Sequence, residues 1–428
     1  MRLGIVVQRY GADINGGAEL HARYIAERLA RHHEVAVLTT CARDYVTWAN
    51  ELPPGEEQVR GVPVHRFPVA HPRNPRTFGL RSEHVFTQTH SLQDELSWLD
   101  SEGPASPALI RHLERRRSEY DYYIFFSYRY YHSYHGIRRV PDRAILVPTA
   151  ERDPAVGLAL FRPILRGVRA IMFNSLEEQR MLQHVAGTDR TPSVVVGVGS
   201  DVPDRPQPAR FRQRFGIQAP FVVYIGRIDE NKGCRELFDY FQRYARVVPS
   251  RLDLVLVGNS ILPIPDHPRI HHLGFLSDED KFDALAAAEA LIMPSYFESL
   301  SMVALEAWAL GKPVLANGRC DVLKGQSIRS NAGLYYESFP EFAEALQAIV
   351  SSYSLKRALG RNGMTYFRQH YAWSVIERKY LDMLERLSAE PHDSGIEPLP
   401  GFFARRRRVL PPAEDVLRTV PAGAVVGA

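Results

Sequence analysis

The feature that most constrains the fold of this chain is a regular alternation of short apolar runs with stretches of helical periodicity. Near the amino end, residues 3–7 form an apolar run, apolar side chains then recur every three or four positions up to residue 29, and a second run follows at residues 35–38. Short apolar runs separated by helices are typical of parallel strands joined by crossover helices. The sequence therefore predicts an α/β fold built on parallel sheets.

The alternation occurs in two series. Further apolar runs lie at residues 122–126, 145–148, 170–174 and 194–198, and then at residues 221–225, 252–257, 291–294 and 313–316. Between the two series, residues 201–208 contain three prolines and two aspartates, a composition that interrupts regular structure. The 428 residues are enough for two domains of ordinary size, so we expect two similar α/β halves.

Two segments depart from this alternation. Residues 41–120 read as a loop-rich insertion of the first half that ends in a basic helix at residues 111–117. Residues 388–428 are rich in proline and glycine and contain four consecutive arginines, Arg405 to Arg408, so we expect a disordered tail. The arginine run is either a solvated charge cluster, as such runs usually are, or a contact for acidic lipid or nucleic acid.

Charge and cysteine content exclude several classes of protein. The formal net charge of +4 is too even to predict nucleic-acid binding, and no apolar stretch reaches the eighteen residues that a membrane span needs. The first apolar run is also too short for a signal peptide. The three cysteines, Cys41, Cys234 and Cys320, are scattered and form neither a disulfide framework nor a CxxC metal site. We expect a cytoplasmic protein. Its basic segments leave open a peripheral contact with the inner face of the membrane.

Two carboxylates eight positions apart form the strongest candidate site. Glu298 follows an expected strand and an aromatic turn, whereas Glu306 lies inside an otherwise apolar helix, residues 302–310. A buried carboxylate costs several kcal/mol unless something hydrogen-bonds to it, and a ribose diol can do so. The alternative for Glu306 is an ion pair with an arginine or lysine of another helix. The amides that open this helix, at residues 300–302, are also well placed for an anion.

A second candidate lies after the expected strand at residues 221–225. Arg227 and Lys232 are placed between Gly226 and Gly233, at the carboxyl end of that strand. Parallel α/β sheets bind ligands at this edge, and two cations there suit a pyrophosphate whose charge builds as it leaves. The alternative is a pair of solvated loop charges.

Two further patterns are weaker. Gly16 and Gly17 precede a helix after the first strand, where backbone can approach a ligand, although an ordinary tight turn is equally consistent. The triplet at residues 278–280 matches the metal-binding DxD pattern but follows Ser277 and opens a helix, so we interpret it as a helix cap. None of the sixteen histidines joins a set with metal-ligand spacing, and we expect no metal site.

Together, the two carboxylates with seven residues between them and the Gly-Arg…Lys-Gly loop resemble the motifs of retaining glycosyltransferases of family 4. The resemblance extends over about residues 1–387. It implies the GT-B architecture, in which two Rossmann-like domains with parallel sheets face each other across a cleft. We accordingly expect a first domain at residues 1–199, a second at residues 200–368, and a terminal helix at residues 369–387 that packs back on the first domain.

The resemblance also implies an activity. A hexosyltransferase-type enzyme of this family moves a sugar, with retention of configuration, from a nucleotide diphosphate sugar to a glycan or lipid-linked acceptor, in polysaccharide or glycoconjugate biosynthesis. Such enzymes need no cofactor or tightly bound metal, and the leaving phosphate helps to deprotonate the acceptor. Two alternatives stay open: a catalytically silent, glycosyltransferase-like binding subunit, and a sugar-nucleotide epimerase or a phosphorylase on the same fold.

The family pattern gives roles to the residues that match it. Arg227 and Lys232 would bind the donor diphosphate, Glu298 would contact the transferred sugar, and Glu306 would hold the ribose. The turn at residues 274–276 would meet the base. The further donor contacts that the resemblance implies are Gly16, Gly17, Gly226, Phe275, Leu276, Ser299, Leu300, Ser301 and Met302.

The chain departs from the family pattern in two places. Where many relatives carry a histidine followed by acidic residues, this sequence has Ala150 and then Glu151, so Glu151 or Asp153 is the candidate for the missing sugar contact. Residues 298–301 read Glu-Ser-Leu-Ser instead of Glu-Gly-Phe-Gly, a milder change because backbone amides bind there.

An aromatic segment at residues 128–135 follows a strand of the first half. Aromatic faces with polar tips suit stacking against sugars, so Tyr131 and Tyr134 are candidate acceptor contacts. Local packing of these tyrosines is the alternative.

Overall fold

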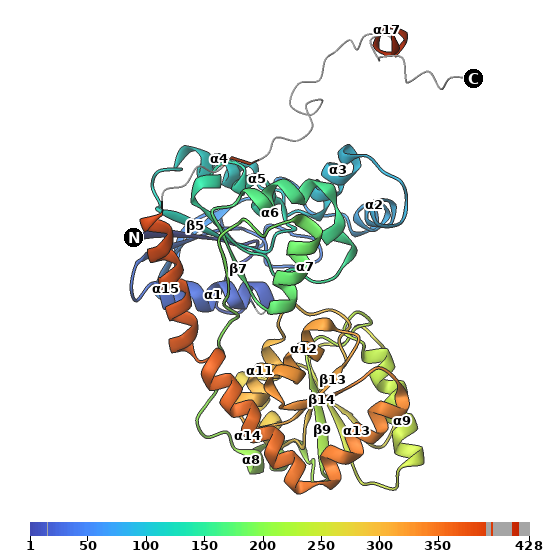
Figure 1. Cartoon of the computed structure of the whole chain (residues 1–428). Coiled ribbons are helices and arrows are strands. Elements are labelled where there is room, and N and C mark those ends of the chain that lie inside the picture. The colour runs from blue at the N-terminus through green and yellow to red at the C-terminus, as the bar shows by residue number, and fades with distance from the viewer. Residues whose placement is uncertain (15, 391–394, 397–412, 419–428) are drawn as a thin grey trace, which may run out of the picture.

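The computed structural model describes residues 1–14, 16–390, 395–396 and 413–418, and it has two lobes, each built on one sheet (Figure 1). The predicted disordered tail, with Arg405 to Arg408, lies mostly outside the described residues. Short apolar strands alternate with amphipathic helices in both lobes. Because both faces of each sheet are covered by helices, most strands are buried over their whole length, as β5 (Tyr122–Phe126) is.

The first lobe contains an eight-stranded sheet in the order β3-β4-β2-β1-β5-β6-β7-β8, in which only β3 runs antiparallel to its neighbour. The other strands of this sheet are β1 (Arg2–Val6), β2 (Glu34–Thr40), β3 (Gly55–Val59), β4 (Val62–Phe67), β6 (Ala144–Val147), β7 (Ala170–Phe173) and β8 (Ser193–Val195). Its helices are α1 (Gly17–Leu29), α2 (Pro75–Thr87), α3 (Leu92–Glu102), α4 (Pro107–Arg115), α5 (Tyr131–Ile137), α6 (Arg162–Gly167) and α7 (Leu176–Ala186).

The second lobe contains a six-stranded, fully parallel sheet in the order β11-β10-β9-β12-β13-β14. Its strands are β9 (Phe221–Ile225), β10 (Asp253–Val257), β11 (Ile270–His272), β12 (Leu291–Met293), β13 (Val314–Asn317) and β14 (Gly333–Tyr336). Its helices are α8 (Pro208–Phe215), α9 (Cys234–Val247), α10 (Asp278–Ala287), α11 (Met302–Ala309), α12 (Asp321–Ser330), α13 (Phe339–Ser351) and α14 (Tyr353–His370). The prediction of an α/β protein with two parallel sheets is confirmed.

The region at residues 41–120 is more regular than we expected. It forms the hairpin β3–β4 and the helices α2, α3 and α4, and β4 pairs with β2 in the main sheet. The expectation of a loop-rich insertion was therefore wrong. Two of these helices begin at capping residues close by in the sequence: the side chains of Asn74 and Ser91 cap α2 and α3, respectively.

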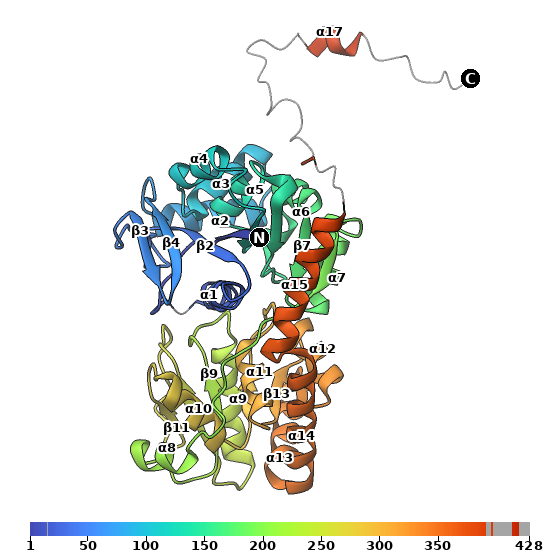
Figure 2. The same cartoon turned by 90° about the vertical axis from the view of Figure 1, so that its left-hand side faces the viewer.

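The chain crosses between the lobes twice, and the two crossings lie against each other. Residues 196–207 lead from β8 to α8, and the junction of α14 with α15 (Trp373–Ala389) leads back to the first lobe (Figure 2). A side chain at Gly197 would meet the ring of Tyr371 at 2.6 Å, and one at Gly199 would meet the ring of Trp373 at 2.6 Å. The glycines therefore let the two segments touch.

Helix α15 then packs beside α1, although the two are more than 340 residues apart in sequence. The guanidinium of Arg28 lies 3.4 Å from the carboxylate of Glu377, and the ring of Trp373 packs edge-on against Tyr24. The apolar side chains of α15 that are buried in this contact include Ile376, Tyr380, Leu384 and Leu387.

Candidate functional site

The carboxyl ends of the parallel strands of both sheets meet at the junction of the lobes. A cavity there takes its lining from both sides of the junction: Ala150, Arg152, Glu177, Glu178 and Met181 from the first lobe, and Tyr296, Phe297, Glu298, Arg319, Cys320, Asp321 and Val322 from the second. Open α/β sheets bind their ligands at this edge. The candidate residues Glu151, Lys232 and Glu298 all follow strands that end here.

Lys232 and Glu298 form an ion pair at the floor of this junction. The distance from Lys232 Nζ to Glu298 Oε1 is 2.7 Å, and the two side chains are 29% and 12% exposed. Burial lowers the pKa of Lys232, but the neighbouring carboxylates of Glu298 and Glu151 outweigh it, so that the pKa lies above the ordinary value. Lys232 therefore stays a cation and is available to an anionic ligand that enters between the lobes.

The loop that carries Lys232 is held by a buried aspartate. Asp229 is 2% exposed; one of its oxygens accepts a hydrogen bond from the backbone amide of Lys232 at 2.8 Å, and the other pairs with the guanidinium of Arg227. The Arg227 side chain remains half exposed, and its charge acts on Lys232. The structure thus brings both predicted cations to one loop, while the role of Asp229 in holding them was not predicted.

Glu151, in the segment that departs from the family pattern, faces this ion pair from the first lobe. Burial raises its pKa; the charge of Lys232 opposes this rise and that of Glu298 adds to it. Behind it, Glu178 accepts hydrogen bonds from the amides of Ala150 and Asn174, both at 2.5 Å, and so fixes the ends of β6 and β7. The arrangement places a third carboxyl group beside Lys232 and Glu298.

The raised pKa of Glu151 makes a prediction about stability. A carboxyl group whose pKa is higher in the folded than in the unfolded state costs stability as the pH rises through the folded pKa. The Glu151→Gln variant should therefore melt a few degrees above the wild type at pH 7 to 8, and the difference should vanish below pH ~4, where both states are protonated. Differential scanning calorimetry across this range measures it. Glu337→Gln is the control, because Lys324 lowers the pKa of Glu337 and no such gain is expected; equal melting temperatures of wild type and Glu151→Gln at pH 8 would contradict the prediction.

Glu306 is buried where the second lobe meets the connecting segment. It lies in α11 and is 3% exposed. Its Oε1 atom accepts a hydrogen bond from Ser200 Oγ at 2.8 Å and lies 3.2 Å from Lys281 Nζ. Its Oε2 atom is covered and has no hydrogen-bond partner among the residues that the structure describes. The alternative of a lysine partner from another helix is thus realised at one oxygen, whereas the other oxygen has no partner among the described residues.

Residues 299–302 link Glu298 to the start of α11. Leu300 is buried and its carbonyl accepts a hydrogen bond from Gln326 at 2.9 Å, and Ser299 lies 3.4 Å from Asn174 of the first lobe. Ser301 caps the helix that begins at Met302, but its φ of +71° lies in the left-handed region that favours glycine. Strained backbone of this kind concentrates at functional sites.

The strain at Ser301 can be separated from its capping role by two substitutions. Ser301→Ala loses the cap and keeps the strain, so its free energy of unfolding should be about 1 kcal/mol lower than that of the wild type. Ser301→Gly loses the same cap but relieves the left-handed strain, and should be about 1 kcal/mol more stable than the alanine variant. Urea denaturation of the three proteins gives the ranking, and an alanine variant as stable as the glycine variant would show that the backbone is not strained there.

The remaining donor candidates lie around the same edge. Gly16 caps α1, and a side chain added to it would meet the carboxylate of Glu19, which forms a 2.6 Å ion pair with Arg9. Gly17 has open space around it. On the other lobe, Gly226 adopts a φ of +153°, and its amide donates to the carbonyl of Val257 at 2.9 Å.

The turn predicted to meet the base follows β11. Phe275 is an exposed apolar side chain, and Leu276 is half-buried against the core. The acidic triplet at residues 278–280 starts α10, and Ser277 Oγ accepts a hydrogen bond from the Asp280 amide at 3.1 Å. The interpretation of this triplet as a helix cap is confirmed.

Two of the acceptor candidates do not face the junction. Tyr134 is buried in the core of the first lobe, where its ring packs edge-on against Phe161. Tyr131 is half-buried and its ring packs against His135, within α5. The structure therefore supports the local-packing alternative for this pair. The period of an aromatic helix predicts which side chains share a face, but it does not tell whether that face meets solvent or the sheet.

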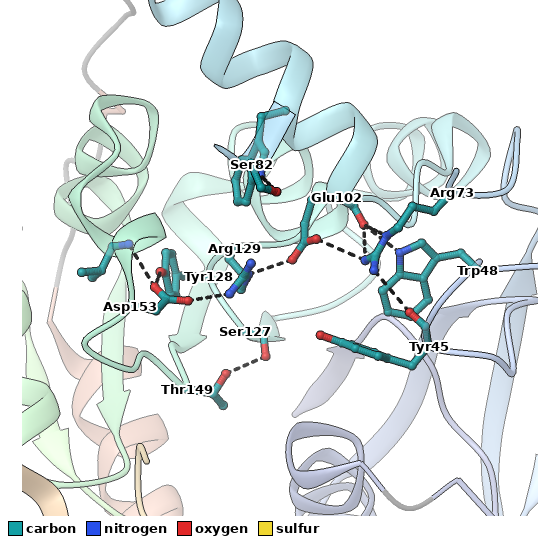
Figure 3. A network of polar contacts seen from close by, with 12 residues as sticks. Tyr45, Trp48, Arg73, Ser82, Glu102, Ser127, Tyr128, Arg129, Thr149 and Asp153 are labelled. Carbon is teal, nitrogen blue, oxygen red and sulfur yellow. Dashed lines mark hydrogen bonds and ion pairs between the residues drawn. The ribbon is translucent and has the colours of Figure 1, made fainter. Parts of the chain in front are cut away.

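Asp153 belongs to a polar network inside the first lobe (Figure 3). Its carboxylate lies 2.6 Å from Arg129, which also lies 2.8 Å from the buried Glu102; Glu102 is in turn 3.2 Å from Arg73. The network joins α3 and the segment before α2 to the ends of β5 and β6. Asp153 therefore positions the loop that carries Glu151, and Glu151 is the carboxyl group of the two that faces the second lobe.

Several side chains bridge the lobes at the junction. Arg152 lies 3.1 Å from Asp321, and Arg329 of α12 donates to Glu177 of α7 at 2.9 Å. These pairs, like Ser200 with Glu306, join residues more than 100 positions apart. The sequence offered no signal for them, because no local pattern couples two separate lobes.

Two other observations concern the described part of the chain. Within it, no group of three or more histidine, cysteine, aspartate or glutamate side chains is arranged to hold a metal ion. None of its helices combines the length and the apolar character that crossing a bilayer would take.

Several known proteins are similar to this chain. Residues 219–352 match the family model described as glycosyl transferases group 1. The chain is 26% identical over 200 residues to mannosylfructose-phosphate synthase of Agrobacterium fabrum, covering 42% of this chain and 43% of that protein. It is 30% identical over 205 residues to D-inositol 3-phosphate glycosyltransferase of Nocardia farcinica, covering 43% and 45%. The chain spans about half the length of the curated relatives it matches.

The fold is shared more widely. Sucrose-phosphate synthase of Thermosynechococcus elongatus superposes with a TM-score of 0.67 at 18% identity, over 91% of this chain and 99% of that one. The Anabaena HepE protein in complex with UDP-glucose superposes with a TM-score of 0.64 at 19% identity, over 90% and 100%. The chain therefore has the GT-B fold of these glycosyltransferases, and its second lobe carries the match to glycosyl transferases group 1.

Proposed function

We propose that this protein is a retaining glycosyltransferase that transfers a hexose from a nucleotide diphosphate sugar to a glycan or lipid-linked acceptor. The observation that carries the proposal is the edge of the second sheet, where the Lys232–Glu298 ion pair and the unpartnered Oε2 of Glu306 both lie on segments that follow β9 and β12. A cation and a buried oxygen acceptor on one edge suit a diphosphate and a ribose diol.

The donor would lie between the lobes with its diphosphate against Arg227 and Lys232. Lys232 would then exchange its ion pair with Glu298 for one with the phosphate. This would free the Glu298 carboxylate to accept hydrogen bonds from hydroxyl groups of the sugar. The charge of the leaving diphosphate grows in the transition state, and a preorganised cation stabilises that charge most. No metal or cofactor enters the proposal. Because Glu306 Oε2 is covered, a ribose reaches it only when neighbouring groups move apart.

The acceptor would approach from the first lobe, past Glu151. Its hydroxyl would attack the carbon that the diphosphate leaves, on the same face, and the departing phosphate oxygen would take the proton. The named relatives transfer sugars, which favours transfer over a binding-only subunit, an epimerase or a phosphorylase. A peripheral membrane contact would fit a lipid-linked acceptor, and the exposed arginines of α4 are where we would seek it.

The donor site can be tested before any acceptor is known. Melting temperatures are measured with UDP, GDP and ADP, without metal, for the wild type and for Glu306→Ala. A nucleotide present at about 100 times its Kd stabilises the fold by roughly 2.7 kcal/mol, which one of the three should do for the wild type only. Consumption of the matching nucleotide sugar, with analysis of the product, then distinguishes transfer or hydrolysis from epimerisation. If none of the nucleotides or their sugar conjugates shifts the wild type, the proposal is wrong.

A further inference from the structure

The surroundings of Glu306 are asymmetric in a way that the proposed ribose contact alone does not explain. Three separate segments meet at this carboxylate: α11 carries it, α10 supplies Lys281, and the connecting segment supplies Ser200. Both partners contact the same oxygen, Oε1, at 3.2 and 2.8 Å. The other oxygen, Oε2, is buried and accepts no hydrogen bond from the described residues.

Lys281 is itself held in place. Its Nζ atom lies 3.2 Å from Asp278 at the start of the same helix and 4.2 Å from the centre of the Phe282 ring, and the side chain is only 18% exposed. These contacts restrict the rotamers of Lys281 and keep its ammonium group beside Glu306, whereas an exposed lysine samples many rotamers in solvent. Its charge also offsets the cost of burying a carboxylate in α11.

The hydroxyl of Ser200 restricts the rotation of the Glu306 carboxylate about its last torsion angle. A carboxylate with one partner can rotate about its last torsion, whereas two donors on one oxygen, from different directions, select one orientation. That orientation turns Oε1 toward α10 and the connecting segment, and leaves Oε2 with its acceptor sites empty. An unsatisfied buried acceptor is costly unless a ligand completes it.

We infer that Lys281 and Ser200 are positioning residues that orient Glu306 so that Oε2 alone accepts the ribose hydroxyls of the donor nucleotide, which sets the preference of the enzyme for ribonucleotides. This inference rests on the proposed function. It adds two residues from outside both donor motifs, and one of them, Ser200, belongs to the segment that joins the lobes.

The test compares a ribonucleoside diphosphate with its 2′,3′-dideoxy counterpart, with the base chosen from UDP, GDP and ADP by what binds the wild type. Calorimetric titration gives both Kd values. Since hydrogen bonds to a charged acceptor are strong, the wild type should prefer the ribonucleotide by about 30-fold or more. In Lys281→Met and in Ser200→Ala this ratio should fall to about fivefold or less, because the carboxylate loses its fixed orientation.

The ratio is the decisive quantity, because a merely structural role of these residues would weaken both nucleotides alike. Lys312→Met is the matched control: this lysine is also half-buried and donates to the carbonyl of Ala288 at 2.9 Å. It lies just before β13, at the amino end of the strands, and should keep the wild-type ratio. If Lys281→Met does not fold, Ser200→Ala, which removes only one hydroxyl, decides alone.

The outcomes separate the two proposals. A wild type that binds none of the three nucleotides overturns the proposed function itself. A wild type that binds ribonucleotide and dideoxynucleotide equally has a nucleotide site in which Glu306 does not hold the ribose, and the inference falls. A wild-type ratio preserved in Lys281→Met and Ser200→Ala overturns the inference and leaves the proposed function standing.

Discussion

The Lys232→Ala variant should transfer sugar about 100 to 1,000 times more slowly than the wild type at saturating donor, the loss expected when one preorganised donor to a developing negative charge is removed. The physical reason is the position of Lys232 Nζ, half-buried, 2.7 Å from Glu298 and kept cationic by two carboxylates. The loss should appear mainly in kcat, because the charge on the leaving diphosphate is larger in the transition state than in the bound donor. Release of nucleoside diphosphate from the donor measures it.

The second lobe offers a matched control for this variant. Lys356 also pairs with a glutamate, Glu289, and its side chain is similarly exposed, at 26% against 29% for Lys232. Glu289 precedes β12, however, whereas Glu298 follows it. The control pair therefore lies at the amino ends of the strands, away from the junction. Lys356→Ala should keep the wild-type kcat. A Lys232→Ala enzyme with normal kcat would remove this lysine from the chemistry.

Gly233→Ala should be the most destabilising single substitution in the loop at residues 226–233, with a loss of about 3–5 kcal/mol. Gly233 caps α9 with a φ of +70°, and a side chain there would lie 2.0 Å from the carbonyl oxygen of Pro294. That oxygen cannot move aside easily, because it accepts a hydrogen bond from the buried Asn317 at 2.9 Å. The substitution therefore strains the backbone and pushes apart the two segments that carry Lys232 and Glu298. Urea denaturation measures the loss.

Gly216→Ala separates the two causes of this loss. Gly216 has the same φ of +70°, but nothing lies within 4 Å of the position that its side chain would take. It should cost only the left-handed strain, about 1–2 kcal/mol. The difference between the two variants measures the collision with Pro294, and two variants of equal stability would show that the loop yields freely.

The sequence predicted those parts of the fold that follow from local pattern. Buried parallel strands are continuous apolar runs, so β5 and β9 were predicted with the bounds that the structure has. The short strands β11 and β14 were not predicted, because three or four residues with histidine or exposed tyrosine carry no such signal. The strands β3 and β4 were missed for a similar reason: β3 is mostly exposed glutamate and glutamine at the edge of its sheet.

The candidate site divides in the same way. Lys232 and Glu298 lie on loops that follow β9 and β12, and neighbouring parallel strands bring their carboxyl ends together, so their proximity could be expected. That Glu306 needs a partner could also be predicted, since a carboxylate in an apolar helix must be compensated. The identity of the partners could not be predicted. Ser200 is 106 residues away and Lys281 sits on a helix whose rotation about its axis depends on the packing of the whole lobe.

The last helix of the chain has a consequence for how such a protein can be recombined. Helix α15 follows the second lobe in sequence but covers α1 of the first, where Ile376 and Leu384 are buried and Arg169 donates to the carbonyl of Leu387 at 2.7 Å. Exchanging everything after the connecting segment for that of another protein would therefore also replace part of the first lobe's surface. The boundary between the lobes in the sequence therefore differs from the boundary in space: a gene fusion that brings a new second lobe must also bring a terminal helix that fits the first lobe.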